Sequence, residues 1–415
     1  MSEVRDKASR AKQATRLMNG LTTEQKNEAL ALMADALIAE SAVILEANAK
    51  DLERGRRDGT SESLLDRLAL NPKRIAGIAE GLRQIIDLPD PTGLLLDDTT
   101  RPNGLNIRKI SVPLGVVAIV YEARPNVTVD AAGLCLKSGN AVVLRGGSAA
   151  LESNKAIIAV MHDALSRSAV PAESLQLIES SDRASVDELL KLNGLLDVII
   201  PRGGRSLIQN VLKNATVPVI ETGEGICHTY LDDEADPAIA DPIVINAKVQ
   251  RPSVCNSLET LLVHERYAAR HLAELAGKLK ELGVELRGCA KSRTLVPWMG
   301  EATEEDWRTE YGELILSVKT VSGLDEALDH IREYGTFHSE CIVTEHAGRA
   351  AQFLRDVDAA AVYHNASTRF TDGFEFGYGA EIGISTQKLH ARGPMGLPAL
   401  TSTKFIVQGN GQIRG

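Results

Sequence analysis

The sequence predicts an α/β protein whose parallel sheets are covered by helices on both faces. Short continuous apolar runs, such as 115–121 and 141–145, alternate with amphipathic helical segments, which is typical of βαβ units. The chain has 415 residues, which is enough for two or three domains. Hydrophobic residues make up 44%, charged residues 25% and aromatic residues 4%, which is the composition of a folded globular protein.

The first ninety residues read as helices. The segment Thr22-Thr23-Glu24-Gln25 has the T-x-x-Q pattern of a capping box, and apolar residues at helical spacing follow it. Further helical segments are expected at 41–56 and 72–86, and a cluster of Pro and Gly then ends the helical region.

The next region predicts a doubly wound nucleotide-binding domain. Residues 105–115 alternate polar and apolar side chains, as a half-buried antiparallel strand does. Beyond them we expect buried strands at 115–121, 141–145, 175–178, 196–200 and 217–221, and helices near 126–138, 148–167 and 204–213.

A second α/β region is expected over about 228–366. Its strands are predicted at 258–263, 284–287, 314–321, 340–344 and 359–364, and its helices near 266–282, 324–333 and 346–356.

Two alternating segments lie outside both regions. Residues 105–112 and 401–412 could pair as an arm, and an exposed arm of this kind is best explained as an oligomer contact. The segment between, 370–398, is rich in Gly and Pro and has no period.

Composition excludes several classes of function. Lys and Arg number 46 against 56 Asp and Glu, so the formal charge of −10 attracts neither nucleic acid nor anionic membranes. Five cysteines without a C-x-x-C pair suggest free thiols in a reducing compartment. No apolar stretch is long enough for a membrane span or leader, so a cytoplasmic address is expected, and no metal-ligand spacing is present.

Two glycine turns at predicted strand ends are candidate nucleotide sites. Arg202-Gly203-Gly204-Arg205-Ser206 follows a strand and opens a helix, where free amides and arginines suit a phosphate. A second turn, Arg145-Gly146-Gly147-Ser148, lies in the same predicted sheet. The alternative is that each is a simple turn that starts a helix.

Cys255 is the candidate nucleophile. It lies in QRPSVCNS, between a helical segment and a strand and near Arg251, where a cation can lower the pKa of a thiol. The alternative is an inert buried thiol, as expected for Cys135 and Cys341. His228 and His338 are each isolated, and such histidines are more often structural than catalytic.

In order, these segments resemble the aldehyde dehydrogenase superfamily. SVPLGVVAIVYEARPN resembles its strand before an oxyanion asparagine, GNAVVLRGGS its ribose-binding strand end, ETGEG its glutamate segment and QRPSVC its nucleophile loop. VSGLDEALDHIREYGTFHSECI (321–342) is similar to the signature of the γ-glutamyl phosphate reductase family, with Tyr334-Gly335-Thr336 and His338-Ser339-Glu340 at its spacing.

The resemblance implies a fold and domain bounds. The fold is a Rossmann-type cofactor domain with an α/β catalytic domain and a β-arm for oligomerisation. The NADP(H)-binding domain covers 1–98 and 116–225, the catalytic domain 226–398, and the arm 99–115 with 399–415.

The resemblance also implies a reaction. L-glutamyl 5-phosphate and NADPH give L-glutamate 5-semialdehyde, NADP⁺ and phosphate, which is the second step of proline synthesis from glutamate. Cys255 matches the nucleophile that forms a thioester, and Asn126 matches the side-chain donor to the oxyanion.

Cofactor and substrate residues follow by position. Arg145 matches a cation near the adenosine ribose, Gly203 and Gly204 the pyrophosphate turn, and Glu313 the nicotinamide-ribose carboxylate. Many NAD-selective relatives have glutamate where this chain has Ser148, so Ser148 favours NADP(H). For the substrate anion the candidates are Arg251, His338 and Arg369.

Three alternatives remain at this stage. Glu221 matches the base of hydrolytic relatives, so a hydrolytic or coenzyme A-acylating aldehyde dehydrogenase is possible, as is a non-catalytic binding protein of the same fold. A homo-oligomer is expected, and a functional contact with glutamate 5-kinase is plausible because acyl phosphates hydrolyse readily.

Overall fold

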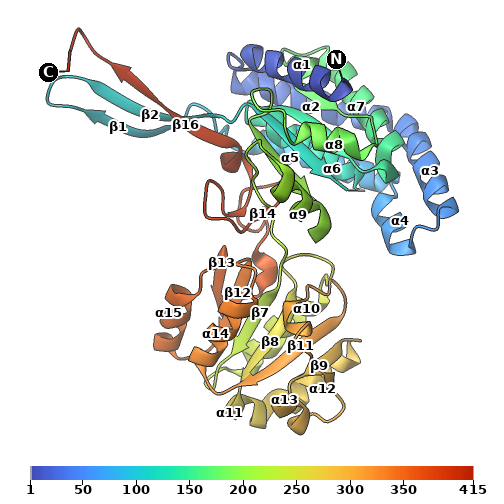
Figure 1. Ribbon diagram of the computed structural model, residues 1–415, viewed down its shortest axis with the longest axis vertical. Coiled ribbons are helices and arrows are strands. Elements are labelled where there is room, and N and C mark those ends of the chain that lie inside the picture. Colours follow the sequence, from blue (N-terminus) through green and yellow to red (C-terminus); the bar gives the residue numbers. More distant parts are fainter. Residues whose placement is uncertain (1, 123, 415) are drawn as a thin grey trace. The chain divides into compact units, whose positions relative to one another are not determined.

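The chain forms two compact units in the computed structural model, which describes residues 2–122 and 124–414 (Figure 1). Unit 1 contains Met1–Thr222, Gly377–Gly383 and Met395–Gly415. Unit 2 contains Gly223–Phe376 and Ile384–Pro394. Ala123, part of the YEARPN motif, and the two terminal residues lie outside the described part.

Five helices open unit 1. The side chains of Ser2, Thr22, Ser61 and Asn71 each accept a hydrogen bond from the backbone at a helix start. The capping box is confirmed, since Thr22 N–H donates to Gln25 Oε1 at 2.9 Å and Gln25 N–H to Thr22 Oγ1 at 3.3 Å. The helices are α1 (Glu3–Met18), α2 (Thr23–Ala39), α3 (Ser41–Arg57), α4 (Glu62–Leu68) and α5 (Pro72–Asp87).

A parallel sheet of order β5-β4-β3-β6 forms the centre of unit 1. Every residue of the two central strands is buried, as their continuous apolar sequence predicts. The strands are β3 (Val116–Tyr121), β4 (Ala141–Gly146), β5 (Leu175–Leu177) and β6 (Val198–Arg202), and the helices are α6 (Pro125–Lys137), α7 (Leu151–Leu165), α8 (Arg183–Leu189) and α9 (Arg205–Asn214). The strand predicted at 217–221 is reduced to one bridge between Ile199 and Val219.

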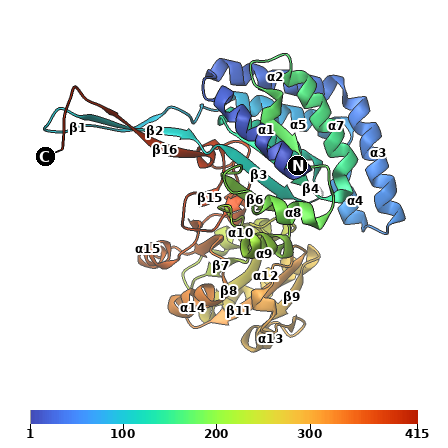
Figure 2. The same cartoon turned by 45° about the horizontal axis from the view of Figure 1, so that its top comes forward.

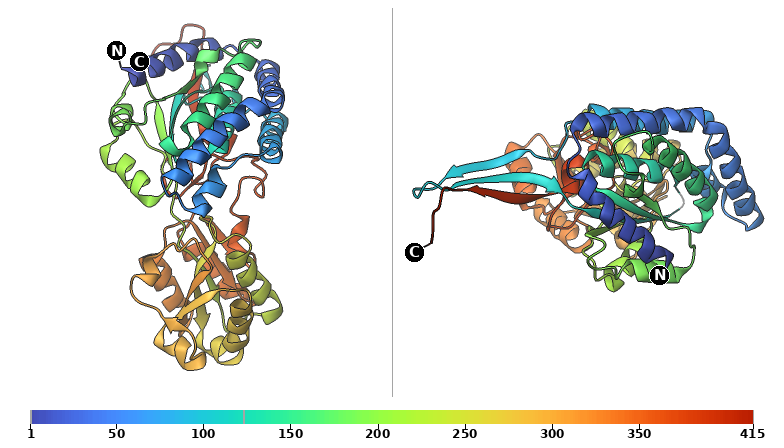
Figure 3. Two further views of the ribbon diagram at one scale, coloured as in Figure 1. Left: turned by 90° about the vertical axis from the view of Figure 1, so that its right-hand side faces the viewer. Right: turned by 90° about the horizontal axis from the view of Figure 1, so that it is seen from above.

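The predicted arm is an antiparallel sheet of β1 (Leu95–Thr100), β2 (Asn106–Pro113) and β16 (Thr401–Gln408). The pairing predicted between its two alternating segments is confirmed, from Thr401 opposite Pro113 to Gln408 opposite Asn106. The sequence prediction began the arm at residue 99 and missed the start of β1, because Asp97 and Asp98 interrupt any alternation. Figures 1, 2 and 3 show this sheet projecting from the helices of unit 1.

Unit 2 contains a seven-stranded parallel sheet of order β10-β9-β11-β8-β7-β12-β13. Five of its strands agree with the predicted ones, but β7 was missed because buried His228 and Thr229 make its sequence polar. The strands are β7 (Cys227–Leu231), β8 (Leu258–His264), β9 (Glu285–Gly288), β10 (Gly300–Glu301), β11 (Ile315–Val321), β12 (Ser339–Val343) and β13 (Ala361–His364).

Helices cover both faces of the unit 2 sheet. Along β7, β8 and β12 successive side chains enter two different cores, for example Leu231 in one and Tyr230 in the other. The helices α10 (Pro237–Val249) and α12 (Ala273–Glu281) contribute to the first core, and α14 (Leu324–Tyr334) and α15 (Ala347–Asp356) to the second. The short α11 (Glu265–Tyr267) and α13 (Ala290–Leu295) complete the unit.

The segment at 370–398 divides between the two units, whereas the sequence prediction assigned it wholly to the catalytic domain. Ile382 N–H donates to Met395 O at 3.0 Å, and Met395 N–H donates to Gly383 O at 2.8 Å, so these residues pair within unit 1. The intervening β14 (Ile384–Ser385) and β15 (Gly393–Pro394) pair within unit 2. No helix among the described residues is both long and apolar enough to span a bilayer.

Candidate active site

Cys255 lies in a turn at the edge of the unit 2 sheet where the strands begin. The turn connects α10, which ends at Val249, to β8, which begins at Leu258. Cys227 opens β7 and Ser339 opens β12, so their amino ends meet at the same edge. The side chain of Cys255 is partly exposed, and all five cysteines are free, as predicted.

The backbone of residue 225 lies directly against the Cys255 turn. A Cβ atom on Gly225 would stand 1.5 Å from Cys255 O and 2.5 Å from its carbonyl carbon. Only glycine permits this approach, because a Cβ would overlap backbone atoms. The next residue is also anchored, since Ile226 N–H donates to Thr336 Oγ1 at 3.0 Å.

Buried Cys227 and His338 lie beneath the same turn. The Cys227 thiol donates to Cys255 O at 3.2 Å, and His338 Nδ1 lies 3.8 Å from Cys227 Sγ. Burial, together with the charge of Glu340, raises the pKa of the Cys227 thiol well above its usual value. Burial also lowers the pKa of His338 to about 4, so its ring is neutral at pH 7. That neutrality argues against the sequence-based role of His338 as a cation for the substrate.

Two arginines lie close to Cys255. Arg369 donates through Nη1 to Asn256 Oδ1 and through Nε to Gln250 Oε1 at 3.0 Å. Burial lowers the pKa of Arg369, and the nearby charges of Arg251 and Cys255 also act on it. Arg251, Arg369 and Cys255 therefore lie close enough for their charges to interact, and the carboxylate of Asp372 acts on Arg369 as well.

Glu313, which was predicted to bind the nicotinamide ribose, and nearby Glu310 have different surroundings. Glu313 is exposed. Glu310 instead accepts a hydrogen bond from the backbone of Gly225, and burial together with the charge of Glu224 raises its pKa. Glu310 therefore lies beside the Cys255 turn, and no local pattern distinguished it from Glu313 in the sequence.

A buried ion pair supports the segment that carries Glu310. Lys248 Nζ lies 2.6 Å from Glu259 Oε2, and both side chains are inaccessible to solvent. Glu259 Oε1 also accepts a hydrogen bond from Gly312 N–H at 3.2 Å, two residues beyond Glu310. Burial raises the pKa of Glu259 to about 7.

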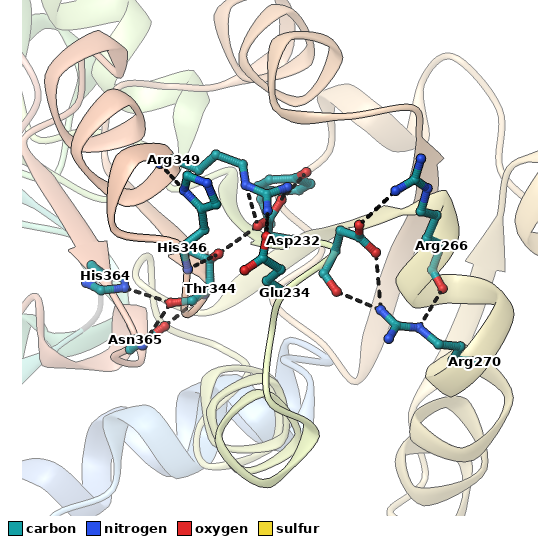
Figure 4. Close-up of polar contacts among 11 residues, drawn as sticks. Asp232, Glu234, Arg266, Arg270, Thr344, His346, Arg349, His364 and Asn365 are labelled. Atoms are coloured by element: carbon teal, nitrogen blue, oxygen red, sulfur yellow. Dashed lines mark hydrogen bonds and ion pairs between the residues drawn. The ribbon is translucent and has the colours of Figure 1, made fainter.

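The opposite edge of the unit 2 sheet carries a separate polar network (Figure 4). Buried Asp232 accepts hydrogen bonds from Tyr230, Thr344 and Arg349, and Arg349 also pairs with Glu234. The carboxylate is thus fully used in tying strand ends to α15. Within residues 2–122 and 124–414 no group of three or more His, Cys, Asp or Glu side chains is arranged to hold a metal ion.

The two glycine turns of unit 1 differ in whether a side chain caps the start of the helix that follows. At the first turn the buried carboxylate of Asp51 accepts from Ser153 N–H at 2.8 Å and from Ser153 Oγ at 2.7 Å, which caps the start of α7. At the second turn the N-cap residue of α9 is Gly204, which has no capping side chain. A Cβ on Gly203 would lie 2.7 Å from Glu122 Cδ, so the turn is also closely packed. The start of α9 is therefore without a side-chain cap, and the carboxyl group of Glu122 lies next to this turn.

Asn126 lies in the first turn of α6, directly after β3. Its side chain is exposed, and Nδ2 donates to Asp130 Oδ2 at 3.2 Å. Burial raises the pKa of Asp130 to about 6, while Asn126 and the charge of Arg202 oppose that shift.

Arg145 and Ser148 have different surroundings. Arg145 is buried, and it donates to Ser181 O at 2.8 Å and Asp182 O at 3.3 Å, so it also braces a neighbouring loop. Ser148 O accepts from Arg54 Nη2 at 2.8 Å. No local pattern pointed to this contact of Arg54, because Arg54 lies on α3, far from Ser148 in the chain. Glu221, near the end of unit 1, is partly buried, and burial raises its pKa.

Comparison with known proteins gives a consistent family assignment. A family model described as "Aldehyde dehydrogenase family" matches residues 1–294. A gamma-glutamyl phosphate reductase from Moorella thermoacetica is 59% identical over 412 residues, covering 99% of both chains. One from Bacillus mycoides is 57% identical, and all of both chains is covered.

Solved structures agree. A gamma-glutamyl phosphate reductase from Thermotoga maritima has a TM-score of 0.98 and 49% identity, with both chains fully covered. An acetylating aldehyde dehydrogenase from Geobacillus thermoglucosidasius has a TM-score of 0.72 at 18% identity and covers 100% of this chain and 98% of its own, which shows a shared fold. The aldehyde-dehydrogenase-like α/β fold predicted from the sequence is therefore confirmed. The chain belongs to the aldehyde dehydrogenase family and, within it, to the gamma-glutamyl phosphate reductases.

Proposed function

We propose that this chain reduces L-glutamyl 5-phosphate to L-glutamate 5-semialdehyde and phosphate, through a thioester on Cys255. The reductase activity, and with it the place in proline biosynthesis, follows from full-length relatives that carry the reductase name. The observation that carries the mechanism is the Cys255 turn. Here a partly exposed thiol stands near two arginines, on a backbone held by Gly225 and Cys227.

The first chemical step is acyl transfer to the protein. The Cys255 thiolate attacks the acyl carbon, the bond from that carbon to the phosphate oxygen breaks, and phosphate leaves with the bonding electrons. Arg251 and Arg369 supply positive charge that attracts the phosphate and stabilises the thiolate. The protein as a whole is acidic, so this positive charge has to be local. Asn126 is the proposed side-chain donor to the oxyanion, with the Cys255 backbone amide as its partner.

The cofactor residues are proposed from unit 1 and from the Cys255 turn. The glycine-capped start of α9 fits a pyrophosphate, because a carboxylate already caps α7 while Gly204 brings no side chain to α9. Arg145 would serve the adenosine ribose, and Glu310 replaces Glu313 as the proposed ribose carboxylate beside the nucleophile. When bound, the nicotinamide supplies the hydride that takes the thioester to the aldehyde level.

A preference for NADP(H) over NAD(H) is part of the proposal. Ser148 brings no negative charge to the strand end, and the Arg54 guanidinium stands against its carbonyl oxygen. Arg54 also pairs with Asp51 and is one-third exposed, so part of its surface is available to a phosphate. Both features favour a 2′-phosphate at this position.

The arm is proposed to join copies of this chain into a homo-oligomer. Both outer strands of its sheet expose apolar side chains, namely Leu95, Leu96, Phe405 and Val407. Unpaired strand edges with exposed apolar residues are stable when another subunit covers them. The free thiols favour the cytoplasm, and direct transfer of the labile acyl phosphate from glutamate 5-kinase remains a hypothesis.

The reverse reaction tests this function. Purified protein with glutamate 5-semialdehyde and NADP⁺ should form NADPH beyond a single turnover only when inorganic phosphate is added. Cys255→Ala should abolish this activity, because no thioester can form. Cys289→Ala is the matched control, since Cys289 is also free and partly exposed but lies beyond β9 at the other sheet edge.

Two results would overturn the proposal. NADPH formation that continues past one turnover without phosphate would mean that water or another acceptor takes the acyl group, and it would make Glu221 the candidate base. Full activity in Cys255→Ala would remove Cys255 as the nucleophile.

A further inference from the structure

The family signature at 321–342 has no chemical role in the mechanism above, yet two of its residues contact the strand beside the nucleophile. Thr336 Oγ1 accepts from Ile226 N–H at 3.0 Å, and His338 Nδ1 lies 3.8 Å from Cys227 Sγ. Both contacts fall on the segment 225–227, the same segment that lies against the Cys255 carbonyl.

The carbonyl of Cys255 is enclosed by this segment. Gly225 leaves room for the Cys255 carbonyl, because a Cβ atom at position 225 would stand only 1.5 Å from its oxygen. The Cys227 thiol donates a hydrogen bond to the same oxygen at 3.2 Å. Asn256, the next residue, is held from the other side by Thr371 O, to which Nδ2 donates at 2.8 Å. The carbonyl of Cys255 and the side chain of the next residue are therefore both held in place.

The chemistry of Cys227 suits a permanent donor. A thiol donates only while it is protonated, and the fully buried Cys227 has a pKa raised by burial and by Glu340. It is therefore neither a rival nucleophile nor a charge that would repel the Cys255 carbonyl oxygen. His338 is neutral and also fully buried, so it brings no positive charge that would favour loss of the proton from the Cys227 thiol.

We propose that Cys227 is a positioning residue for the nucleophile. Its thiol holds the Cys255 carbonyl, while His338 and Thr336 of the signature hold the segment that carries Cys227. Fixing that carbonyl fixes the peptide plane after Cys255 and so constrains the backbone from which its Cα–Cβ bond projects. The proposal rests on Cys255 being the nucleophile, and it gives the signature segment a function.

The test compares Cys227→Ala and Cys227→Ser with the control Cys341→Ala. Cys341 is equally buried, lies in the same sheet, and also donates its thiol to a backbone carbonyl, that of Ala366 at 3.1 Å. The readouts are kcat and KM of the reverse reaction and the rate at which iodoacetamide alkylates Cys255, located by peptide mass spectrometry. Thermal unfolding of each variant shows that it is folded.

The proposal predicts a fall in kcat of roughly 10- to 100-fold for Cys227→Ala with little change in KM, because the nucleophile is misplaced while binding is retained. The alkylation rate of Cys255 should change as well. Cys227→Ser restores a donor and should return kcat to within about threefold of the unchanged protein. Equal kcat in Cys227→Ala and Cys341→Ala would overturn the proposal.

A second variant covers the case in which Cys227→Ala does not fold. Thr336→Val removes the acceptor for Ile226 N–H at a partly exposed position, and it should lower kcat with KM unchanged. An unchanged kcat in that variant contradicts the proposal. The proposed function fails separately, because it predicts that Cys255→Ala is inactive whatever Cys227 does.

Discussion

At the scale of single residues, Asp130 combines a stability cost with a contact to Asn126, the proposed oxyanion donor. Its carboxylate accepts from Asn126 Nδ2 at 3.2 Å, which leaves the second hydrogen of that amide available to an oxyanion. Burial raises the pKa of Asp130 to about 6, so the folded protein holds this carboxylate in an unfavourable state at neutral pH. Such a cost is expected where a group is kept for function.

The direction of the pH dependence follows from that shift. The unfolded chain releases the Asp130 proton near pH 3.8 and the folded chain near pH 6, so folding binds protons between these values. The contribution of Asp130 to stability therefore falls as pH rises through this window, and above it the ionised group costs up to about 3 kcal/mol. Asp130→Asn should then raise the Tm at pH 8 by about 2–4 °C and raise it by only about half as much at pH 5, which lies inside this window.

Thermal unfolding at the two pH values checks this prediction. Asp163→Asn is the control, because Asp163 is an exposed carboxylate of α7 that pairs with the neighbouring Arg167. A lower Tm for Asp130→Asn than for the control at pH 8 would show that the carboxylate stabilises the fold, contrary to the account.

Some of the candidate residues could be predicted from the sequence, and others could not. Cys255 and Arg251 stood out because a loop thiol near a cation is a local pattern. Glu310 did not, because only its contact with Gly225, eighty-five positions earlier, separates it from exposed Glu313. The full burial of His338, which keeps it neutral, is likewise a property of packing.

At the scale of elements, two similar glycine turns precede helices whose starts are capped differently. The sequence suggested both as phosphate sites, since each follows a buried strand and precedes a helix. Asp51 of α3 fills the first helix terminus, and Gly204 leaves the second without a side-chain cap. The difference depends on a contact between residues about a hundred positions apart, so no local pattern could predict it.

The arm yields the second prediction. Phe405 and Val407 are exposed on one face of β16, where the account expects another subunit. Replacing both with Asp should shift the protein to a smaller assembly, because buried charges at an apolar interface are costly. Light scattering after gel filtration measures the mass of the assembly.

The matched control for the arm is Ser402→Asp. Ser402 is exposed on the same strand, but its side chain points to the opposite face. The control should assemble as the unchanged protein does. An assembly that stays intact when Phe405 and Val407 are both replaced would show that this face of the arm is not the contact.

At the scale of the whole molecule, the alternation of apolar strands and helices was sufficient to predict two α/β regions. The strand order in unit 2 could not be predicted, because β11 inserts between β8 and β9 through contacts that no local pattern records. β7 was missed because its buried polar residues serve other contacts, His228 pairing with Glu340 at 2.9 Å. In both cases tertiary contacts override local preference.

The two units present their candidate residues at opposite ends of their parallel strands. Asn126 and the glycine turns follow the carboxyl ends of β3, β4 and β6, where α/β sheets usually bind ligands. Cys255 instead lies where β7, β8 and β12 begin, while the network of Asp232 and Arg349 fills the opposite edge (Figure 4). The sequence predicted Cys255 as the candidate nucleophile, but which edge of the sheet carries Cys255 follows only from the strand order.

The central claim is that the acyl group passes through Cys255, and the acyl enzyme itself is the most direct test. Protein incubated with glutamate 5-semialdehyde and NADP⁺ in the absence of phosphate should retain a glutamyl thioester, since no acceptor removes it. Peptide mass spectrometry should locate that adduct on Cys255, and added phosphate should release it. No adduct, or an adduct on another residue that phosphate still releases, would contradict the account.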